Sequence, residues 1–202
     1  MTRLALLAPD TLNAAQRKIF DAITKGPRTQ NTPRSAGIAL NSPAGLPGPF
    51  NAWMYSPVIG NLIQELGAAL RFSSSLPNNL LEIAVLMVGK QWLAQFEFWA
   101  HARLAKAAGV SEAAIEAIRL GAEPGFDTPE EMQIYLFARE FIETKRTSDK
   151  TYALTRALVG EQGLVDLIAL MGYYTMVSMT LNCFQVPLPE GQPLPFAEPA
   201  AG

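Results

Sequence analysis

The chain of 202 residues has almost none of the side chains that form disulfides and soft-metal sites. Its single cysteine, Cys183, excludes an intramolecular disulfide, and its single histidine, His101, excludes a site with several histidine ligands. We therefore expect no metal, since only a carboxylate-rich metal site could form. So little cysteine is typical of an intracellular protein, and we expect a cytoplasmic location.

An excess of positive charge is also lacking. Sixteen lysine and arginine residues stand against 18 aspartate and glutamate residues, which gives a net charge of −2, and no basic run is longer than Lys145-Arg146. Nucleic-acid-binding proteins normally carry a cationic face, so we expect no nucleic-acid partner. Hydrophobic residues make up 49% of the chain, which is enough for a buried core and too much for a disordered protein.

No segment has the features of a signal peptide, because Pro9 ends the short apolar run 4–8. The uncharged stretch 167–189 is long enough to cross a bilayer. Polar side chains are spread through it, however, and Pro187 and Pro189 break its end. We expect a helix buried within the protein or between subunits, and no membrane partner.

Strand patterns are nearly absent, whereas apolar residues recur at helical spacing along most of the chain. The spacing predicts an all-α single domain over residues 1–202 with seven or eight helices. The first helix is expected to be capped by Asp10 or Thr11. The expected helices cover residues 12–25, 58–72, 80–88, 92–108, 111–120, 128–145, 150–159 and 164–182.

The segment 27–57 is rich in proline, and we expect little regular structure there. A solvated linker has little use for its large apolar side chains, so the segment is expected to fold back over the core and cover a pocket. These side chains are Leu46, Phe50, Trp53 and Met54. The tail from residue 187 is again rich in proline and is expected to be extended.

Three ionisable residues stand out by their position. Glu82 lies in the apolar run 80–88, where a carboxylate does not easily stay charged without a partner. Glu97 and His101 are four residues apart and therefore share one face of a helix. An imidazole beside a carboxylate can hold a proton near neutral pH and pass it on. Nearby aromatic residues would form the apolar walls of a small-molecule pocket: Trp92, Phe96, Phe98 and Trp99.

Each of these features also has a purely structural interpretation. Glu97 and His101 could form a solvated helix pair worth about 0.2–0.5 kcal/mol. Glu82 could bridge to another helix, and the aromatic residues could simply fill the core.

The region 79–121 resembles the core of the carboxymuconolactone decarboxylase family, whose superfamily also contains the alkylhydroperoxidase AhpD. The resemblance rests on a glutamate in an apolar helix, an aromatic-rich segment that ends in His101, and Ala-Gly-Val-Ser before an acidic helix. The segments 48–53 and 70–72 are similar to those of longer members of the family. The resemblance implies an AhpD-like helical fold.

The resemblance also indicates that the two redox cysteines of the peroxidase branch are missing from this chain. The peroxidase branch has a glutamate, then a cysteine twelve residues on, a second cysteine after three more, and a histidine after another four. Counted from Glu82, this pattern reaches Ala94, Glu97 and His101, so both redox cysteines are missing. Thiol peroxidase chemistry needs a thiolate and a resolving partner. Cys183 lies in an uncharged helix and is expected to be a small core residue.

What the resemblance implies is proton chemistry without a cofactor on a small lactone or carboxylated compound, such as a decarboxylation. His101 would be the general acid or base, with Glu97 and Glu82 as tuning or relay groups. Arg71 would bind a substrate carboxylate, unless it is an ordinary surface arginine. The pocket or its entrance would be lined by Asn51, Trp53, Trp92, Gln95 and Trp99.

Two other functions stay open at this point, a peroxidase-related antioxidant protein and a non-catalytic ligand-binding homologue. Members of the superfamily assemble through helices. The resemblance therefore implies a homo-oligomer, a trimer or hexamer, with the uncharged segment 167–184 suited to the interface.

Overall fold

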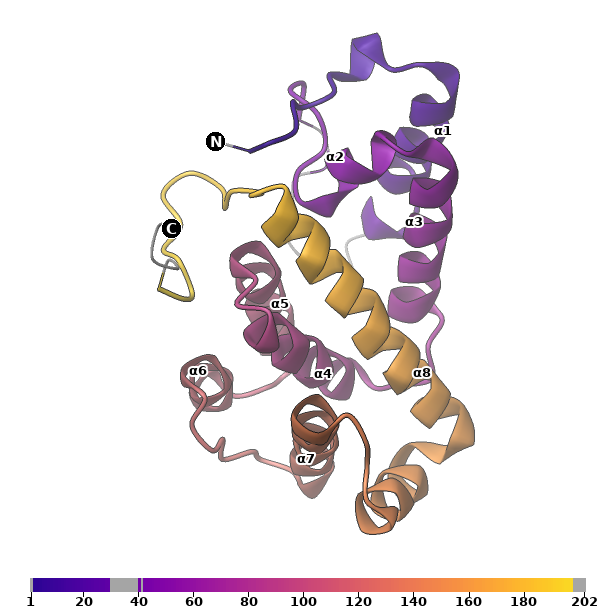
Figure 1. Cartoon of the computed structure of the whole chain (residues 1–202). Coiled ribbons are helices and arrows are strands. Elements are labelled where there is room, and N and C mark those ends of the chain that lie inside the picture. Colours follow the sequence, from indigo (N-terminus) through magenta and orange to yellow (C-terminus); the bar gives the residue numbers. More distant parts are fainter. Residues whose placement is uncertain (1, 30–39, 41, 198–202) are drawn as a thin grey trace.

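A computed structural model describes residues 2–29, 40 and 42–197. Within these ranges the chain folds into helices without any strand, as the sequence predicts (Figure 1). Two short 3₁₀ turns, η1 (Pro9–Thr11) and η2 (Pro27–Thr29), lie on either side of the first of eight α-helices. The α-helices are α1 (Ala14–Thr24), α2 (Pro49–Met54), α3 (Pro57–Phe72), α4 (Asn78–Gln91), α5 (Gln95–Ala107), α6 (Glu112–Leu120), α7 (Pro129–Thr144) and α8 (Asp149–Cys183).

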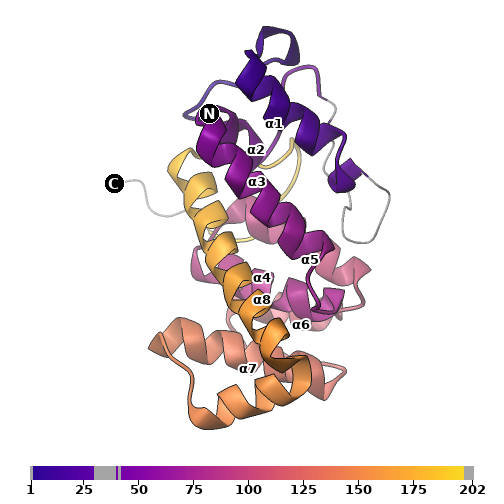
Figure 2. The same ribbon diagram turned by 90° about the vertical axis from the view of Figure 1, so that its right-hand side faces the viewer.

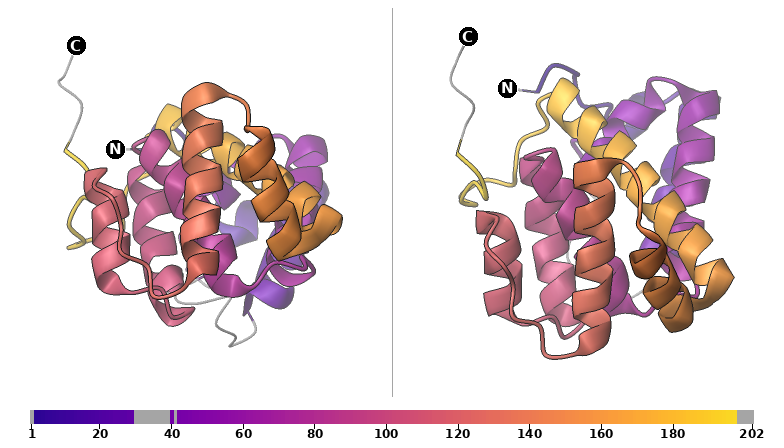
Figure 3. Two further views of the ribbon diagram at one scale, coloured as in Figure 1. Left: turned by 90° about the horizontal axis from the view of Figure 1, so that it is seen from below. Right: turned by 60° about the horizontal axis from the view of Figure 1, so that its bottom comes forward.

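Helix α4 is the centre of the fold. Nine of its 14 residues are buried, and its main neighbours are α5, α7 and α8, which the views in Figure 3 show around it. A helix that is apolar on nearly all sides is stable only when other elements surround it. The apolar run 80–88 therefore fixes the position of Glu82 in the middle of the molecule.

Helix α8 runs along most of the length of the molecule in Figure 1. Gly160 interrupts it with φ 70° and ψ 177°, which suits glycine, so the range contains the two helices predicted over 150–159 and 164–182. Among the described residues, α8 is the one helix long and apolar enough to cross a membrane. Half of its most apolar stretch is buried inside the fold, which favours the core-helix interpretation.

The cap of α1 differs from the prediction. Asn13 takes this role, because its side-chain oxygen accepts from the Gln16 backbone N–H at 2.9 Å while Gln16 Oε1 accepts from the Asn13 N–H at 3.0 Å. This reciprocal pair satisfies two backbone donors that a helix start leaves free. Asp10 and Thr11 lie in the preceding turn η1 instead.

The proline-rich segment 27–57 contains more regular structure than predicted, namely η2 and α2. Pro49 begins α2, where a proline lacks only a hydrogen bond that the first turn does not make. Residues 30–39 and 41 lie outside the described residues. The expected folding back is confirmed, since Leu46 and Met54 are fully buried in a small core under α1. Figure 2 shows α1 packed across α2 and α3.

The predicted helix 92–108 begins three residues late, at Gln95. Helix α4 continues through Gly89 to Gln91, and Leu93 then adopts a left-handed conformation with φ 48°. The Ala94 N–H donates to the Gly89 carbonyl at 2.9 Å and closes this turn. The chain reverses here, and α5 packs against α4.

Candidate active site

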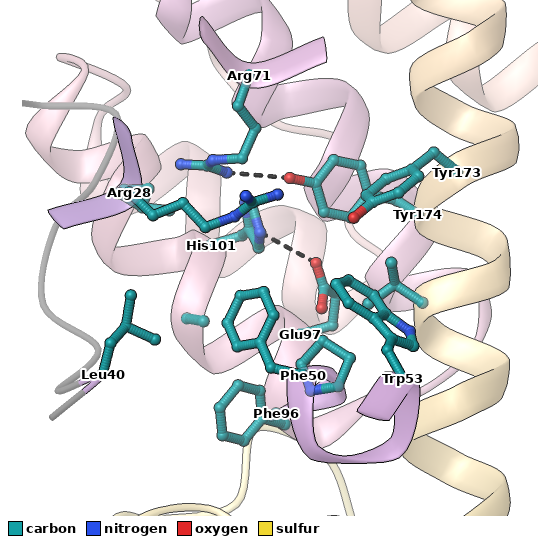
Figure 4. Close-up of a pocket in the computed structure, with 14 residues that line it drawn as sticks. Arg28, Leu40, Phe50, Trp53, Arg71, Phe96, Glu97, His101, Tyr173 and Tyr174 are labelled. Atoms are coloured by element: carbon teal, nitrogen blue, oxygen red, sulfur yellow. Dashed lines mark hydrogen bonds and ion pairs between the residues drawn. The ribbon is translucent and has the colours of Figure 1, made fainter. Parts of the chain in front are cut away.

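Fourteen of the described residues line a cavity of about 90 Å³ between α2, α3, α5 and α8 (Figure 4). Most of its wall is apolar, and a few polar side chains converge on it, as is usual for a small-molecule site. The polar lining residues are Arg28, Arg71, Glu97, His101, Tyr173 and Tyr174. The apolar ones are Leu40, Pro49, Phe50, Trp53, Phe96, Ala100, Leu104 and Val177.

His101 lies between two carboxylates. Its Nδ1 is 2.5 Å from Glu82 Oε2, and its Nε2 is 3.0 Å from Glu97 Oε1. All three residues are buried, with no more than 6% of any of them exposed. Helical spacing brings Glu97 and His101 together within α5, and the packing of α4 against α5 brings Glu82 to the opposite ring nitrogen.

This geometry favours a protonated imidazole. A neutral ring has one N–H and one lone pair, so it would turn a lone pair toward one of the two carboxylates. Burial by itself acts to lower the pKa of His101, but the Tyr174 oxygen and the Glu82 and Glu97 carboxylates raise it, and the pKa lies well above the ordinary 6.5. His101 is therefore a proton donor at neutral pH.

The contact on the Glu97 side is close but poorly aligned. Glu97 Oε1 makes no hydrogen bond to any described residue, although it lies 3.0 Å from the ring nitrogen. Both side chains line the cavity. Nδ1 donates a hydrogen bond to Glu82, whereas the proton on Nε2 makes no well-aligned hydrogen bond to Glu97.

Arg71 reaches the same group from α3. Its Nη1 is 3.6 Å from Glu82 Oε1 and donates to the Tyr174 hydroxyl at 3.0 Å. Burial acts to lower the pKa of Arg71, but the Tyr174 oxygen and the Glu82 carboxylate outweigh it, and the pKa is raised. The Tyr174 ring also packs edge-on against the His101 ring, with centroids 4.8 Å apart. Arg71 therefore supports the Glu82–His101 pair, in addition to lining the cavity as expected.

Several residues predicted for the pocket lie elsewhere. Trp53 lines the cavity, but the Asn51 side chain accepts from the Leu7 N–H at 2.9 Å and donates to the Ala5 carbonyl at 2.9 Å. Asn51 thus fastens the N-terminal segment to α2. Its polar atoms are used by these two backbone contacts, and it faces away from the cavity of His101.

The remaining predicted lining residues are also displaced. Gln95 exchanges hydrogen bonds of 2.8 and 2.9 Å with the backbone of Phe196 and so fixes the C-terminal tail. Trp92 ends α4 on the surface, and Trp99 donates to Gln192 Oε1 at 2.9 Å. Gln95 and Trp99 are each two residues from Glu97, so they lie on nearly the opposite side of α5, whereas Trp92 precedes this helix.

The four aromatic residues expected to form walls have different surroundings. Phe96 lines the cavity, whereas Phe98 packs in the core against Phe196 with ring centroids 5.0 Å apart. Trp99 borders a second cavity, of about 490 Å³, between the N-terminal segment, α5 and the tail. Asn51 and Phe96 line this second cavity as well.

Three polar lining residues were not anticipated from the sequence: Arg28, Tyr173 and Tyr174. The two tyrosines interrupt the uncharged apolar segment 167–189, and that is a signal for a polar site that the sequence does contain. Arg28 lies in a proline-rich segment and has no comparable signal.

The sulfur chemistry of the peroxidase branch has no counterpart near His101. Ala94 and Glu97 stand at the two cysteine positions, and Cys183 is a free thiol at the far end of α8. Contrary to the prediction, Cys183 is exposed, because it is the last residue of the helix and faces outward there. Among the described residues, no group of three or more metal-ligating side chains comes together.

Comparison with known proteins supports the fold. A peroxidase-related protein from Silicibacter sp. TM1040 superposes with a TM-score of 0.68 over 92% of this chain and 91% of that chain, at 12% sequence identity. No family model and no curated protein matches the sequence. At this identity the likeness shows a shared helical architecture, the one that the sequence resemblance implies.

Proposed function

We propose that the protein is a cofactor-independent acid–base enzyme of the carboxymuconolactone decarboxylase family that acts on a small lactone or carboxylated compound. The observation that carries the proposal is the buried His101 between Glu82 and Glu97 at the wall of an apolar cavity. An apolar cavity excludes water, so it protects a carbanion-like intermediate from uncontrolled protonation.

In the proposed reaction, the bond between the substrate carboxylate and its carbon breaks and CO₂ leaves. The electron pair moves into conjugation with the lactone carbonyl and gives a dienolate. The Nε2 proton of His101, which is not aligned with Glu97, moves to the carbon. Glu82 stabilises the imidazolium through Nδ1 before the transfer, and a proton from water restores the imidazolium afterwards.

The first experiment tests His101→Gln on a panel of carboxylated γ-lactones in D₂O. We expect the native protein to release CO₂ and to place one deuterium on the carbon that carried it. General acid–base catalysis is worth about 100-fold to 10,000-fold, so kcat of the variant is expected to fall by about 100-fold or more. Equal turnover by the variant would remove His101 from the mechanism.

A peroxidase-related function is the second candidate, favoured by the structural likeness to a peroxidase-related protein. Cys183→Ser separates the two, because Cys183 is the chain's only thiol. We expect this variant to decarboxylate as the native protein does. Consumption of hydroperoxide that disappears in Cys183→Ser would favour the peroxidase function instead.

A further inference from the structure

The charges around the cavity do not balance. Two guanidinium groups, Arg28 and Arg71, and the protonated His101 face two carboxylates, Glu82 and Glu97. One positive charge is therefore left over among the described residues. Arg28 is partly buried. Charges taken out of water are costly unless they are paired, so the site favours the binding of one further negative charge.

Arg28 is the one of these three cations that has no carboxylate partner among the described residues. His101 and Arg71 both contact Glu82, whereas no carboxylate of a described residue lies within 4.0 Å of Arg28. Its Nη2 donates to the Gln64 carbonyl at 3.0 Å, and Nη1 makes a long contact of 3.4 Å with Gln64 Oε1. A side-chain hydrogen bond to the Tyr173 hydroxyl is a third contact. A guanidinium has five N–H donors, so these three contacts still leave some of them unused. Burial lowers the pKa of Arg28 most, and Arg71 adds to that effect.

The surroundings of Arg28 are shaped for a small apolar molecule. Its guanidinium lies 5.6 Å from the centre of the Phe50 ring, and in Figure 4 the side chain extends toward His101 and Arg71. Gly67 makes this approach possible, because a side-chain carbon there would lie 2.0 Å from the Tyr173 hydroxyl and 3.1 Å from Arg28 Nη2. The cavity volume, about 90 Å³, is several times the roughly 10–15 Å³ that one water molecule needs, so the cavity has room for a small molecule.

We infer that Arg28 binds the acidic group of a small monocarboxylate, whose apolar body fills the cavity beside His101. One negative charge completes the charge balance, and a second would be left without a partner. Arg71, the residue that sequence reasoning favoured as the anchor, is already engaged by Glu82 and Tyr174. The inference rests on the proposed function in one respect only, namely that the bound monocarboxylate is the substrate of the proposed reaction.

The test uses three probes of nearly equal size and shape: crotonate, its neutral isostere crotonamide, and the dianion fumarate. Binding to the native protein is measured by isothermal titration and by the change in tryptophan fluorescence, to which Trp53 in the cavity wall contributes. We expect crotonate to bind at least about tenfold more tightly than either of the others, the worth of one charge-assisted hydrogen-bonded contact. Equal binding of the three, or no binding of crotonate, overturns the inference.

Variants then locate the contact. Arg28→Met is expected to weaken crotonate binding by about tenfold or more, and Arg28→Lys by less, because a lysine keeps the charge but not the forked geometry. Arg103→Met is the matched control, because Arg103 lies over Trp99 at the second cavity. Without ligand, Arg28→Met should melt no lower than the native protein, since it removes an uncompensated cation. Native crotonate affinity in folded Arg28→Met overturns the inference.

Failure of this inference can be distinguished from failure of the proposed function. Crotonate binding that depends on Arg28, without decarboxylation of any lactone, would leave the anchor standing and remove the reaction. Decarboxylation that is lost in His101→Gln but unchanged in Arg28→Met would support the reaction and overturn the role of Arg28 as the anchor.

Discussion

At the scale of single residues, the position of His101 makes the stability of the fold depend on pH. Its pKa is raised in the folded protein, so it adds stability that is fully present below about pH 6.5, declines above that, and is gone once pH passes the raised value. We expect the native melting temperature to fall as pH rises from neutral to alkaline. His101→Gln should lack this component.

The informative quantity is the difference between the two melting curves at each pH, because other groups titrate in both proteins. This difference should shrink toward alkaline pH. Parallel curves across the whole range would show that His101 is not protonated in the native fold.

The residues of the site differ in how far the sequence could predict them. Glu97 and His101 are related by helical spacing, and Glu82 is conspicuous in an apolar run, so local pattern was enough. Tyr174 meets Arg71 across 103 positions of sequence, and Arg28 meets Gln64 from a segment without periodicity. Such long-range contacts depend on how α3, α8 and η2 pack against one another. No local sequence pattern encodes this packing.

At the scale of helices, two glycines form a matched pair for testing how α3 and α8 meet. A side-chain carbon at Gly67 would collide with the Tyr173 hydroxyl, whereas one at Gly172 would meet nothing within 4 Å. We expect Gly67→Ala to destabilise the protein by about 1–3 kcal/mol through overpacking. Gly172→Ala should stabilise it by about 0.5–1 kcal/mol, because alanine favours a helix.

Chemical denaturation measures both effects. If the two variants have the same free energy of unfolding, the close contact between α3 and Tyr173 is not present in solution. Gly67→Ala is also expected to reduce crotonate binding, since the displaced Tyr173 and Arg28 both line the cavity.

Helices were easier to predict than the turns between them. The spacing of apolar residues located every long helix, because each buries one side against its neighbours. The turn at 92–94 was missed, since its left-handed residue is a leucine rather than a glycine. That turn removes Trp92 from the helix that carries His101.

At the scale of the whole molecule, the surface of α3 carries an apolar stripe. Val58 is 77% exposed and Leu62 is 59% exposed, and Ile59 and Leu66 lie on the same side. Monomeric proteins rarely leave such residues grouped. We propose that this stripe contacts a second copy of the chain in the predicted homo-oligomer. In the segment 167–184, which the sequence favours for this role, eight of the 18 residues are buried in the fold, so less of its surface is free for an interface.

We expect light scattering to give a trimeric or hexameric mass for the native protein. Leu62→Glu should reduce that mass to the monomer's, because a charge in an apolar interface costs several kcal/mol. Leu120→Glu is the control, since Leu120 is equally exposed but lies on α6. A native monomer, or dissociation by the control alone, contradicts the proposed interface.

The exposed thiol at the end of α8 also provides a single point of chemical attachment. Because Cys183 is the only cysteine, a maleimide dye would modify one position without any prior mutation. The Cys183 carbonyl accepts from Arg3 Nη1 at 3.0 Å, so the dye would report on the docking of the first residues against this helix. Energy transfer between differently labelled copies would follow subunit exchange in real time.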